Sequence, residues 1–415
     1  MYIGSMKKLL LWIGGILVFL VITVLCLVFF YPDQKLESFD DLKLNLPQIS
    51  EDQNGYEYVL EAYKVFNPLD IYFYDLNEFF KSGKLEDVKE LPDFYPLLKA
   101  NSNVLKAIDM ANEFDYLIPD TDLKGNDSLG DLFSKFIIPS NFVSVNKLLI
   151  TRVLYKLQKG NEDGALDNLL DLIKFQNKSI FISTDLVGYS IQSGALDNSL
   201  YVLNLMLNNS DFNENDYLSL LEFFNNLSPN FIIGRENALK FEFNFGIKMR
   251  QAMVDDVDHD YLSRSKFHYQ PSKTTNVFAE NLRKMINDLF YSADADMLKL
   301  SDKYNDNYLL LLVSPNSYGE VLMSTSMPNS FGCRPLVSSF DFNSLRLLVA
   351  IKLYEIKNNK VPHALDDLVP DYFEDLNWLN FRDERIVDYN SKIKVLFSDF
   401  LQENCKIQKN VDLIK

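Results

Sequence analysis

An acidic cluster in the second half of the chain offers the ligand types that a metal ion would need. The sequence DDVDHD (255–260) places His259 among carboxylates, and such oxygen and nitrogen donors could hold a divalent cation. The spacing matches neither a calcium-binding loop nor an HExxH helix. A solvated acidic loop explains such a charge run better, so we predict no metal site and no cofactor.

Acid–base catalysis would have few histidines to draw on, because the chain contains 3 of them. His363 follows a proline in a predicted surface turn, and His259 and His268 fall in a polar stretch. The sequence has no GxSxG elbow, no Walker loop and no GxGxxG after a strand. With 58 acidic residues, some pairing of carboxylates is inevitable and has no evidential value. We favour a protein without catalysis and keep a carboxylate-based hydrolase as an alternative.

The composition limits the partners and the fold class. The net charge of −17 repels nucleic acid, because phosphates carry the same sign. A hydrophobic content of 47% predicts a sizeable core. Only 15 glycines in 415 residues suit long helices better than a sandwich rich in turns. We therefore expect a mainly α-helical protein that does not bind nucleic acid.

The N-terminus contains a segment long enough to cross a membrane. Leu9 to Phe30 is a run of 22 residues without a charge, and as a helix it would be about 33 Å long. Lys7 and Lys8 precede the run, so the positive-inside rule leaves the N-terminus in the cytoplasm. We predict an uncleaved anchor that contacts the lipid bilayer through residues 9–30.

The two ends of this run carry residues typical of membrane interfaces. Trp12 and Tyr31 are predicted to lie near the two interfaces, close to Leu9 and Phe30 at the ends of the span. A cleaved signal peptide would have a shorter apolar core and small residues at its end. A lipoprotein signal would need small residues just before Cys26. A buried soluble helix would rarely be apolar on every face.

The body is predicted to follow a polar tether. Residues 32–53 are polar and contain two prolines, so they suit a tether between the membrane and residues 54–340, the helical body. Within that body, the stretch 144–181 predicts two helices separated by Lys159-Gly160-Asn161. The motif GALDNLL (164–170) recurs thirty residues later as GALDNSL (194–200). We expect a helical-hairpin bundle or a short α-solenoid.

Irregular segments interrupt the helical pattern in two places. Residues 255–276 lack an apolar periodicity, and residues 314–339 contain Ser, Pro and Gly. The final helix is predicted from residue 342 to residue 358, within a C-terminal part that covers residues 341–415. In this part RIVDY and KIKVLFS predict a small β-hairpin.

Two further groups of side chains leave alternatives open. Cys333 and Cys405 could form a disulfide in an oxidising compartment, or they could be unrelated thiols. Six phenylalanines that lie close in sequence could line a groove for an apolar or peptide ligand. More often such a set is core. The six are Phe223, Phe224, Phe231, Phe241, Phe243 and Phe245.

The C-terminal part resembles the tail of type II secretion major pseudopilins. In that tail a helix ends in a tyrosine, a turn with a proline follows, and the motif xxLxxLV comes next. The matching residues here are Leu353, Tyr354, Pro362, Leu365, Leu368, Val369 and Pro370. The chain also resembles a loose set of uncharacterised membrane-anchored bacterial proteins with a GxxxxALxxLL helix. That helix corresponds to Gly160, Ala165, Leu166, Leu169 and Leu170. The resemblance implies location and architecture, and no activity.

The chain departs from the pseudopilin pattern at both ends. The apolar run contains no glutamate and no glycine stands at a prepilin cleavage point, and NWLNFRDERIVDY replaces the usual DPFGPY continuation. A pseudopilin calcium site is therefore not carried over. We expect a single-pass protein of the bacterial inner membrane with a periplasmic or extracytoplasmic body of binding or scaffolding type. Envelope proteins are its expected partners, and an accessory role in a secretion or pilus-like envelope system is an alternative.

Overall fold

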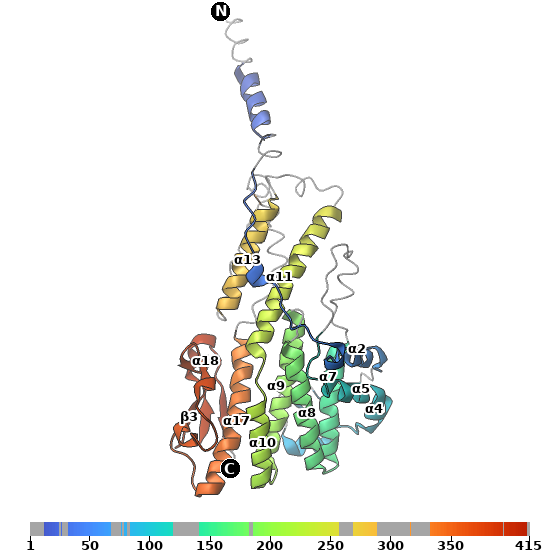
Figure 1. Ribbon diagram of the computed structural model, residues 1–415, viewed down its shortest axis with the longest axis vertical. Coiled ribbons are helices and arrows are strands. Elements are labelled where there is room, and N and C mark those ends of the chain that lie inside the picture. The colour runs from blue at the N-terminus through green and yellow to red at the C-terminus, as the bar shows by residue number, and fades with distance from the viewer. Residues whose placement is uncertain are drawn as a thin grey trace, which may run out of the picture. The chain divides into compact units, whose positions relative to one another are not determined.

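The computed structural model describes residues 12–24, 26, 32–67, 76, 79–80, 84–118, 141–181, 186–256, 269–288, 316, 333–392 and 394–412. These residues are mainly helical, with small antiparallel strands near the C-terminus, and this confirms the predicted α class (Figure 1). The chain divides into unit 1, Met1–Leu44 with Lys240–Ser330, and unit 2, Asn45–Leu239 with Phe331–Lys415. The sequence-based boundaries after residues 31, 53 and 340 remain a prediction.

Three long helices in succession form the centre of unit 2. They are α7 (Asn141–Gln158), α8 (Glu162–Phe181) and α9 (Leu186–Asn209), and each packs against the next. Gly160 adopts a φ of +71° in the turn between α7 and α8, a conformation that glycine adopts without strain. The side chain of Asn161 then accepts a hydrogen bond of 3.1 Å from the Gly164 amide in the first turn of α8. The predicted helical hairpin is therefore confirmed.

Further helices cover the two sides of this centre. On one side α2 (Tyr56–Val65) packs against α5 (Ser102–Asn112), which follows η4 (Leu85–Glu90) and α4 (Tyr95–Ala100). On the other side α17 (Arg334–Asn358) packs against both α9 and α10 (Glu214–Asn226) (Figure 1). The core between them is aromatic and aliphatic, and its largest fully buried side chains include Phe94, Phe175, Phe224, Phe231, Phe340 and Phe342.

Buried polar side chains connect the three central helices. The amide of Gln176 donates to Asn146 Oδ1 at 3.2 Å, and its own oxygen accepts from Ser199 Oγ at 2.8 Å. These three residues belong to α8, α7 and α9, and all of them are buried. A buried polar group without a partner is destabilising, so the hydrogen bonds favour one register of the three helices over others.

The last long helix begins earlier than the sequence predicts. Residues 314–339 were expected to be irregular, but α17 already begins at Arg334. Pro335 lies in the first turn of this helix, where its missing N–H needs no partner. The proline therefore starts a helix here instead of breaking one, and the prediction for residues 334–339 was wrong.

The C-terminal strands confirm the predicted hairpin and extend it. β3 (Asp388–Asn390) pairs antiparallel with β4 (Val395–Phe397), and β5 (Asn410–Asp412) adds a third strand on the other side of β4. A second small pair, β1 (Asn380–Phe381) with β2 (Glu384–Arg385), precedes them. The three residues of β5 show no clear alternation, so the sequence did not predict them as a strand.

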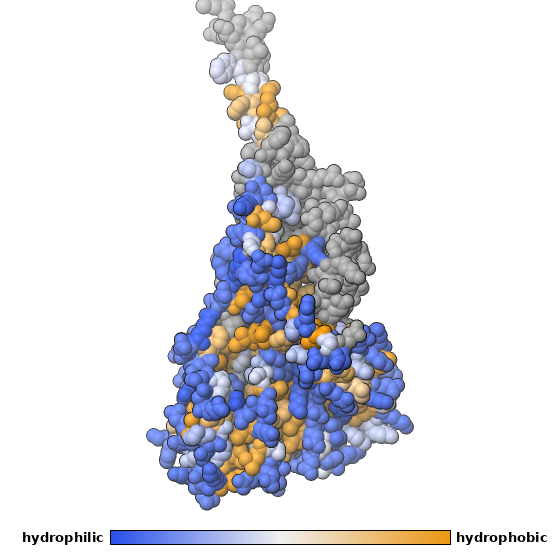
Figure 2. Space-filling view, in the orientation of Figure 1, coloured by the Kyte–Doolittle hydropathy of each residue, from blue (hydrophilic) through white to orange (hydrophobic). Residues whose placement is uncertain are grey.

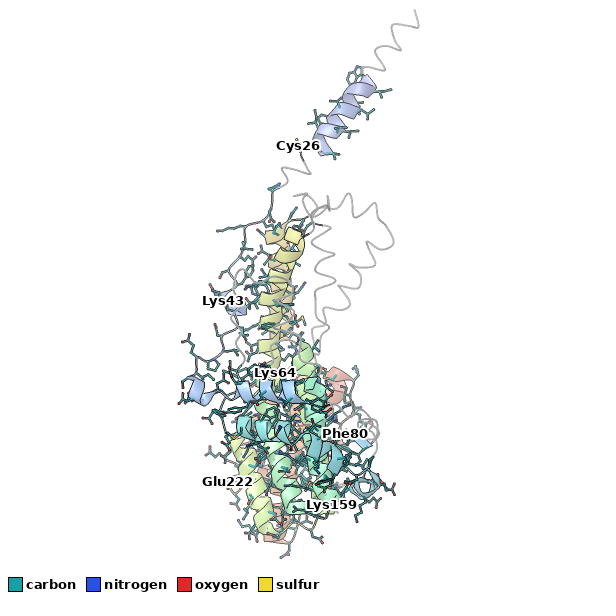
Figure 3. All side chains as sticks on the ribbon, turned by 90° about the vertical axis from the view of Figure 1, so that its right-hand side faces the viewer. Cys26, Lys43, Lys64, Phe80, Lys159 and Glu222 are labelled. Carbon is teal, nitrogen blue, oxygen red and sulfur yellow. A yellow bond between two sulfur atoms is a disulfide. The ribbon has the colours of Figure 1, made fainter. Side chains whose placement is uncertain are left out.

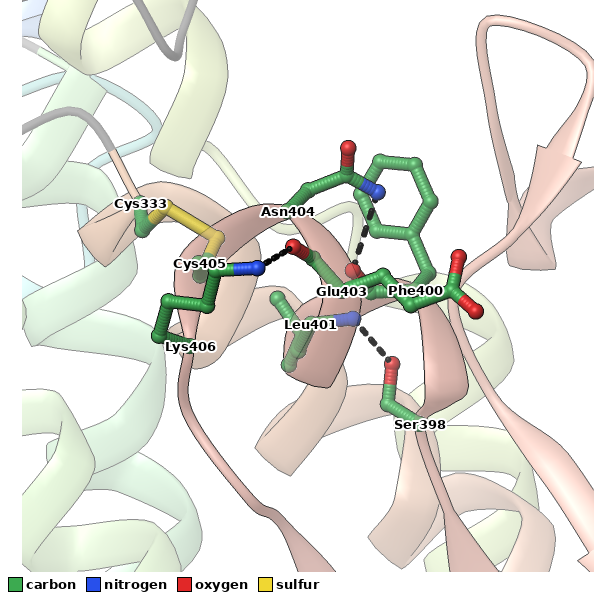
Figure 4. Close-up of a disulfide and its surroundings, with 8 residues drawn as sticks. All are labelled: Cys333, Ser398, Phe400, Leu401, Glu403, Asn404, Cys405 and Lys406. Atoms are coloured by element: carbon green, nitrogen blue, oxygen red, sulfur yellow. Dashed lines mark hydrogen bonds between the residues drawn. A yellow bond between two sulfur atoms is a disulfide. The ribbon is translucent and has the colours of Figure 1, made fainter.

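A disulfide joins this C-terminal part to the start of α17. Cys333 immediately precedes α17, and Cys405 ends α18 (Asp399–Cys405) (Figure 4). Their Cα atoms lie 5.8 Å apart, and the two residues are 72 positions apart in sequence. Ser398 caps α18 through its hydroxyl, which accepts from the Leu401 amide at 3.1 Å.

Unit 1 contains residues 32–44 of the segment that the sequence predicts as a tether. Asp33 accepts hydrogen bonds from the amides of Ser272 and Lys273 in the first turn of α13 (Pro271–Asn287), at 2.8 and 3.1 Å. Further along α13, the Arg283 guanidinium binds the Asp41 carboxylate at 2.7 and 2.9 Å. We call residues 33–41 the strap, because they are bonded along one helix at both ends.

The core of unit 1 is built from aromatic rings. Phe39 of the strap packs edge-on against Phe243, with ring centroids 5.1 Å apart. Phe243 belongs to α11 (Phe231–Asp256) and also stacks on Phe278 of α13 at 5.5 Å. These rings fix the strap between α11 and α13 by burial as well as by hydrogen bonds.

The N-terminal run is described in part. Residues 12–24 are helical, and their apolar side chains are exposed (Figure 2). Trp12 is 74% exposed, whereas Leu9, Phe30 and Tyr31 lie outside the described residues. Within the part of the chain that is described, no helix has both the length and the apolarity needed to cross a membrane.

Removing the disulfide should destabilise the protein. The bridge closes a loop between residues 72 apart, so Cys333→Ser should lower the free energy of unfolding by about 2–4 kcal/mol. Denaturant unfolding of the full chain under oxidising conditions measures the change. Cys26→Ser is the matched control, since Cys26 is a free and exposed cysteine on the N-terminal segment (Figure 3). Equal stability of Cys333→Ser and the wild type would contradict this role.

Candidate functional site

A pocket of about 400 Å³ opens between α7 and α9 of unit 2, beside the first residue of α17. The residues that α7 and α9 contribute recur at helical spacing, so each helix presents one face to the pocket. Phe80, which is labelled in Figure 3, contributes an aromatic ring. The lining consists of Phe80, Val143, Asn146, Lys147, Ile150, Ser190, Ile191, Gly194, Ala195, Asp197, Asn198 and Arg334.

One partly buried ion pair lies at the edge of the pocket. Asp197 Oδ1 accepts from Ser338 Oγ at 2.7 Å, and Asp197 Oδ2 accepts from Arg334 Nη2 at 3.1 Å. Ser338 is fully buried and shares a hydrogen bond of 3.1 Å with Ser193 Oγ. Both oxygens of the carboxylate therefore have donors, as a charge in this position requires.

The ion pair belongs to a polar seam between α9 and α17. Tyr189, Ser193 and Asp197 lie one turn apart on α9, and Ser338 and Asp341 continue the seam on α17. Asp341 is paired in turn with Lys409 Nζ, at 2.7 and 3.1 Å. The seam thus links the wall of the pocket to the segment that precedes β5.

Burial changes how the acids of the seam titrate. Burial raises the pKa of Asp197 to about 6, against the smaller opposing effects of the Ser338 hydrogen bond and the Arg334 charge. The pKa of Asp341 is also raised by burial, and Lys409 opposes the shift. About a quarter of the Asp197 side chain is exposed, 26%, so this group can exchange protons with solvent. Its charge changes around pH 6.

Gly194 provides the space that Arg334 occupies. A β-carbon at this position would lie 2.7 Å from Arg334 Nη2, so any larger residue would displace the guanidinium. Gly194 opens the second copy of the repeated motif, GALDNSL. In the first copy, a β-carbon at Gly164 would instead lie 2.6 Å from Nδ2 of the Asn161 side chain. The two copies therefore match at six of seven positions but have different neighbours.

The residues that the sequence proposed for chemistry do not meet in this pocket. His363 is exposed, and its backbone amide donates to Asp367 Oδ2 at 2.7 Å. His259 and His268 lie outside the described residues, as does most of the acidic cluster 255–260. Among the residues that the structure does describe, no group of acids, histidines and cysteines could hold a metal ion.

Four of the six phenylalanines are core, as the more common explanation predicts, whereas Phe223 and Phe245 are half-buried. Phe224, Phe231, Phe241 and Phe243 are all buried, with exposed fractions of 2% or less. Phe224 belongs to unit 2, whereas Phe241 and Phe243 belong to unit 1, so the set is divided between two cores. A single groove lined by all six is not formed in either unit.

The pocket itself was missed by sequence reasoning, although two signals for it were present. One was the repeated motif, whose second copy lies in an apolar stretch where a glycine needs a packing reason. The other was Asp197, an acid within that stretch. In comparisons with protein-family models, with curated proteins and with solved structures, no match to this chain is found.

The raised pKa of Asp197 predicts a pH-dependent stability. The folded pKa of about 6 exceeds the ordinary value of 3.8. As the pH rises, Asp197 therefore loses its proton in the unfolded chain before it does so in the folded protein. The contribution of Asp197 to the free energy of unfolding is fully present below the unfolded pKa of 3.8. It is lost as the pH rises through the folded pKa of about 6. Relative to Asp197→Asn, the wild type should lose about 2–3 kcal/mol between about pH 4 and 7.

Denaturant unfolding of the two proteins across this pH range measures the difference. Asp341 and the other carboxyls are present in both proteins, so their contributions cancel. A stability difference that does not vary with pH would show that Asp197 titrates normally.

Proposed function

We propose that this protein is a single-pass membrane-anchored binding protein whose helical body lies outside the cytoplasm and carries out no reaction. The anchor is supported by the uncharged run from Leu9 to Phe30, since about 20 apolar residues suffice to span a bilayer. Lys7 and Lys8 before the run support the orientation. The helical conformation and exposed apolar side chains of residues 12–24 agree with a helix that contacts lipid.

The pocket beside Asp197 is the observation that carries the binding role. Its volume of about 400 Å³ lies in the range that small ligands occupy. Its wall combines apolar side chains from α7 and α9 with amide, hydroxyl and charged groups, which is typical of sites that orient a ligand. We propose that the body binds a small molecule here, in a pocket kept open by the small residues Gly194 and Ala195.

A hydrolase is the second candidate, because Asp197 has a pKa near neutrality in a pocket. Its carboxylate could act as a general acid. Against this, both of its oxygens are already bonded, and no other carboxylate lines the described wall. Glycoside and peptide hydrolysis by carboxylates generally needs a second acid near the first. The accessory role in an envelope system rests on the sequence of the tail alone.

Charges within the apolar run should release the protein from membranes. Each arginine at a helix centre opposes insertion by about 2.5–3.5 kcal/mol, so Leu17→Arg with Val21→Arg should move the full chain from the membrane to the soluble fraction. Leu17→Ala with Val21→Ala is the matched control and should stay with the membrane. Protease added to spheroplasts should degrade the body of the wild type.

Either of two results would contradict the predicted anchor. A wild-type chain that is soluble after fractionation would remove the anchor. A body that resists protease in intact spheroplasts, but is degraded once the cells are opened, would place it in the cytoplasm.

Filling the pocket should abolish binding of small molecules without unfolding the protein. Ala195 lines the pocket and is only partly exposed, so Ala195→Phe would place a ring in it. A thermal-shift screen of a small-molecule library against the full chain in nanodiscs should give hits that Ala195→Phe loses. Leu218→Phe, at an exposed position of α10, should keep them. Hits that survive in Ala195→Phe, or a screen without hits, would contradict a binding role for this pocket.

A further inference from the structure

We propose that the pocket takes a small organic anion, with its carboxylate at Arg334 and an apolar arm between α7 and α9. This inference rests on the proposed binding function and names the class of ligand. Three features of the wall support it: the balance of charges, the free donors of one guanidinium, and the separation of polar and apolar groups.

The charge of the described wall favours a negative ligand. Two cationic side chains line the pocket, Lys147 and Arg334, against the single acid Asp197. Each oxygen of Asp197 already accepts one hydrogen bond, and one of them comes from the cation Arg334, so less of its charge is left for a cationic ligand. The positive charges of Lys147 and Arg334 would therefore repel a cationic ligand, and Asp197 is already paired with Arg334. The same two charges would attract an anion.

Arg334 keeps donors that its ion pair does not use. A guanidinium carries five N–H donors, and in the described residues Arg334 donates to Asp197 through Nη2 alone. Its Nε atom is buried and has no hydrogen-bond partner among the residues that are described. Because that Nε atom exposes no surface to the pocket, a carboxylate would bind the Nη1 and Nη2 groups, which together can donate two parallel hydrogen bonds.

The start of α17 adds a second source of positive potential at the same place. Arg334 is the first residue of this 25-residue helix, and the preceding Cys333 makes no side-chain capping bond. The helix dipole is positive at this end, although Pro335 has no N–H and the Leu336 and Val337 amides already donate to the Cys333 carbonyl at 3.1 and 3.0 Å. Arg334 and the helix terminus therefore act on the same side of the pocket, and the disulfide at Cys333 holds that terminus in position.

The apolar part of the wall accounts for the rest of the ligand. Phe80, Val143, Ile150 and Ile191 contribute rings and aliphatic side chains, while Ser190 and Asn198 add polar groups. An unsubstituted inorganic anion would leave these apolar groups without a partner. A short carbon chain would bury them and gain from burial as well as from charge.

The charge on Asp197 should modulate this binding. The groups around Asp197 are Ser338, Arg334 and Asp341 of α17 and Lys409 before β5, with Tyr189 on its own helix. When Asp197 is protonated, Arg334 loses its partner ion and can turn to a bound anion. Because the pKa of Asp197 lies at about 6, anion affinity should rise as the pH falls through this value.

Hexanoate, hexylammonium and hexanol separate the effect of charge from that of chain length. Hexanoate should bind the full chain in nanodiscs saturably, and hexylammonium and hexanol should bind at least tenfold more weakly. Ligand-observed NMR with empty nanodiscs as background measures the three affinities. Arg334→Gln should weaken hexanoate binding about tenfold, since a charge-assisted pair is lost.

Glycine substitutions test the position of the guanidinium without changing any charge. Gly194→Ala should displace Arg334 and weaken hexanoate binding several-fold, while the chain folds normally, because only a flexible side-chain end must move. Gly164→Ala is the matched control in the other copy of the motif and should leave the affinity unchanged. Urea unfolding of each variant shows whether it is folded.

The outcomes distinguish the ligand class from the binding role. Hexylammonium or hexanol binding as tightly as hexanoate, or hexanoate binding unaltered in Arg334→Gln, would overturn the anionic ligand. If Ala195→Phe still blocked the binding of hexylammonium or hexanol, the pocket would remain a binding site, but for another class of ligand. Hexanoate binding that Ala195→Phe does not alter would overturn the site together with the proposed function.

Discussion

A carboxylate inside a helical bundle is tolerated only if the surrounding helices supply donors for it. In unit 2 the acid is Asp197 of α9, and its donors Arg334 and Ser338 come from α17, more than 130 positions later in the sequence. Removing either donor would leave a charge that is partly desolvated. The packing of α9 against α17 is therefore tied to one register, in which the hydroxyl and the guanidinium both reach Asp197.

The start of α17 depends on several constraints that act together. Pro335 favours a helix beginning at Arg334, and the disulfide fixes Cys333 one residue earlier. Gly194 leaves room for the guanidinium on the surface of α9. The geometry at the pocket thus follows from a proline, a cysteine and a glycine, although only the arginine next to them has a side chain suited to hold a ligand.

Local patterns predicted the elements better than they predicted the site. The turn at Lys159-Gly160-Asn161 was recognisable because glycine with a positive φ ends helices, and RIVDY with KIKVLFS alternated clearly enough to indicate β3 and β4. The start of α17 was misjudged because Pro335 was treated as a breaker, although a first helical turn accepts it. The pocket could not be predicted, since it depends on Arg334 meeting Asp197 and Gly194 from a distant part of the chain. No spacing within one helix reveals such a meeting.

The strap has a mechanical consequence for a chain anchored in lipid. Phe30 ends the proposed span, and Asp33 is already bonded to the first turn of α13. Only Tyr31 and Pro32 separate them, and this length of chain reaches at most about 10 Å. If the proposed span lies in a bilayer, the first turn of α13 would stand close to the lipid headgroups, and the Asp33 bonds would transmit a sideways pull on unit 1 directly to that span.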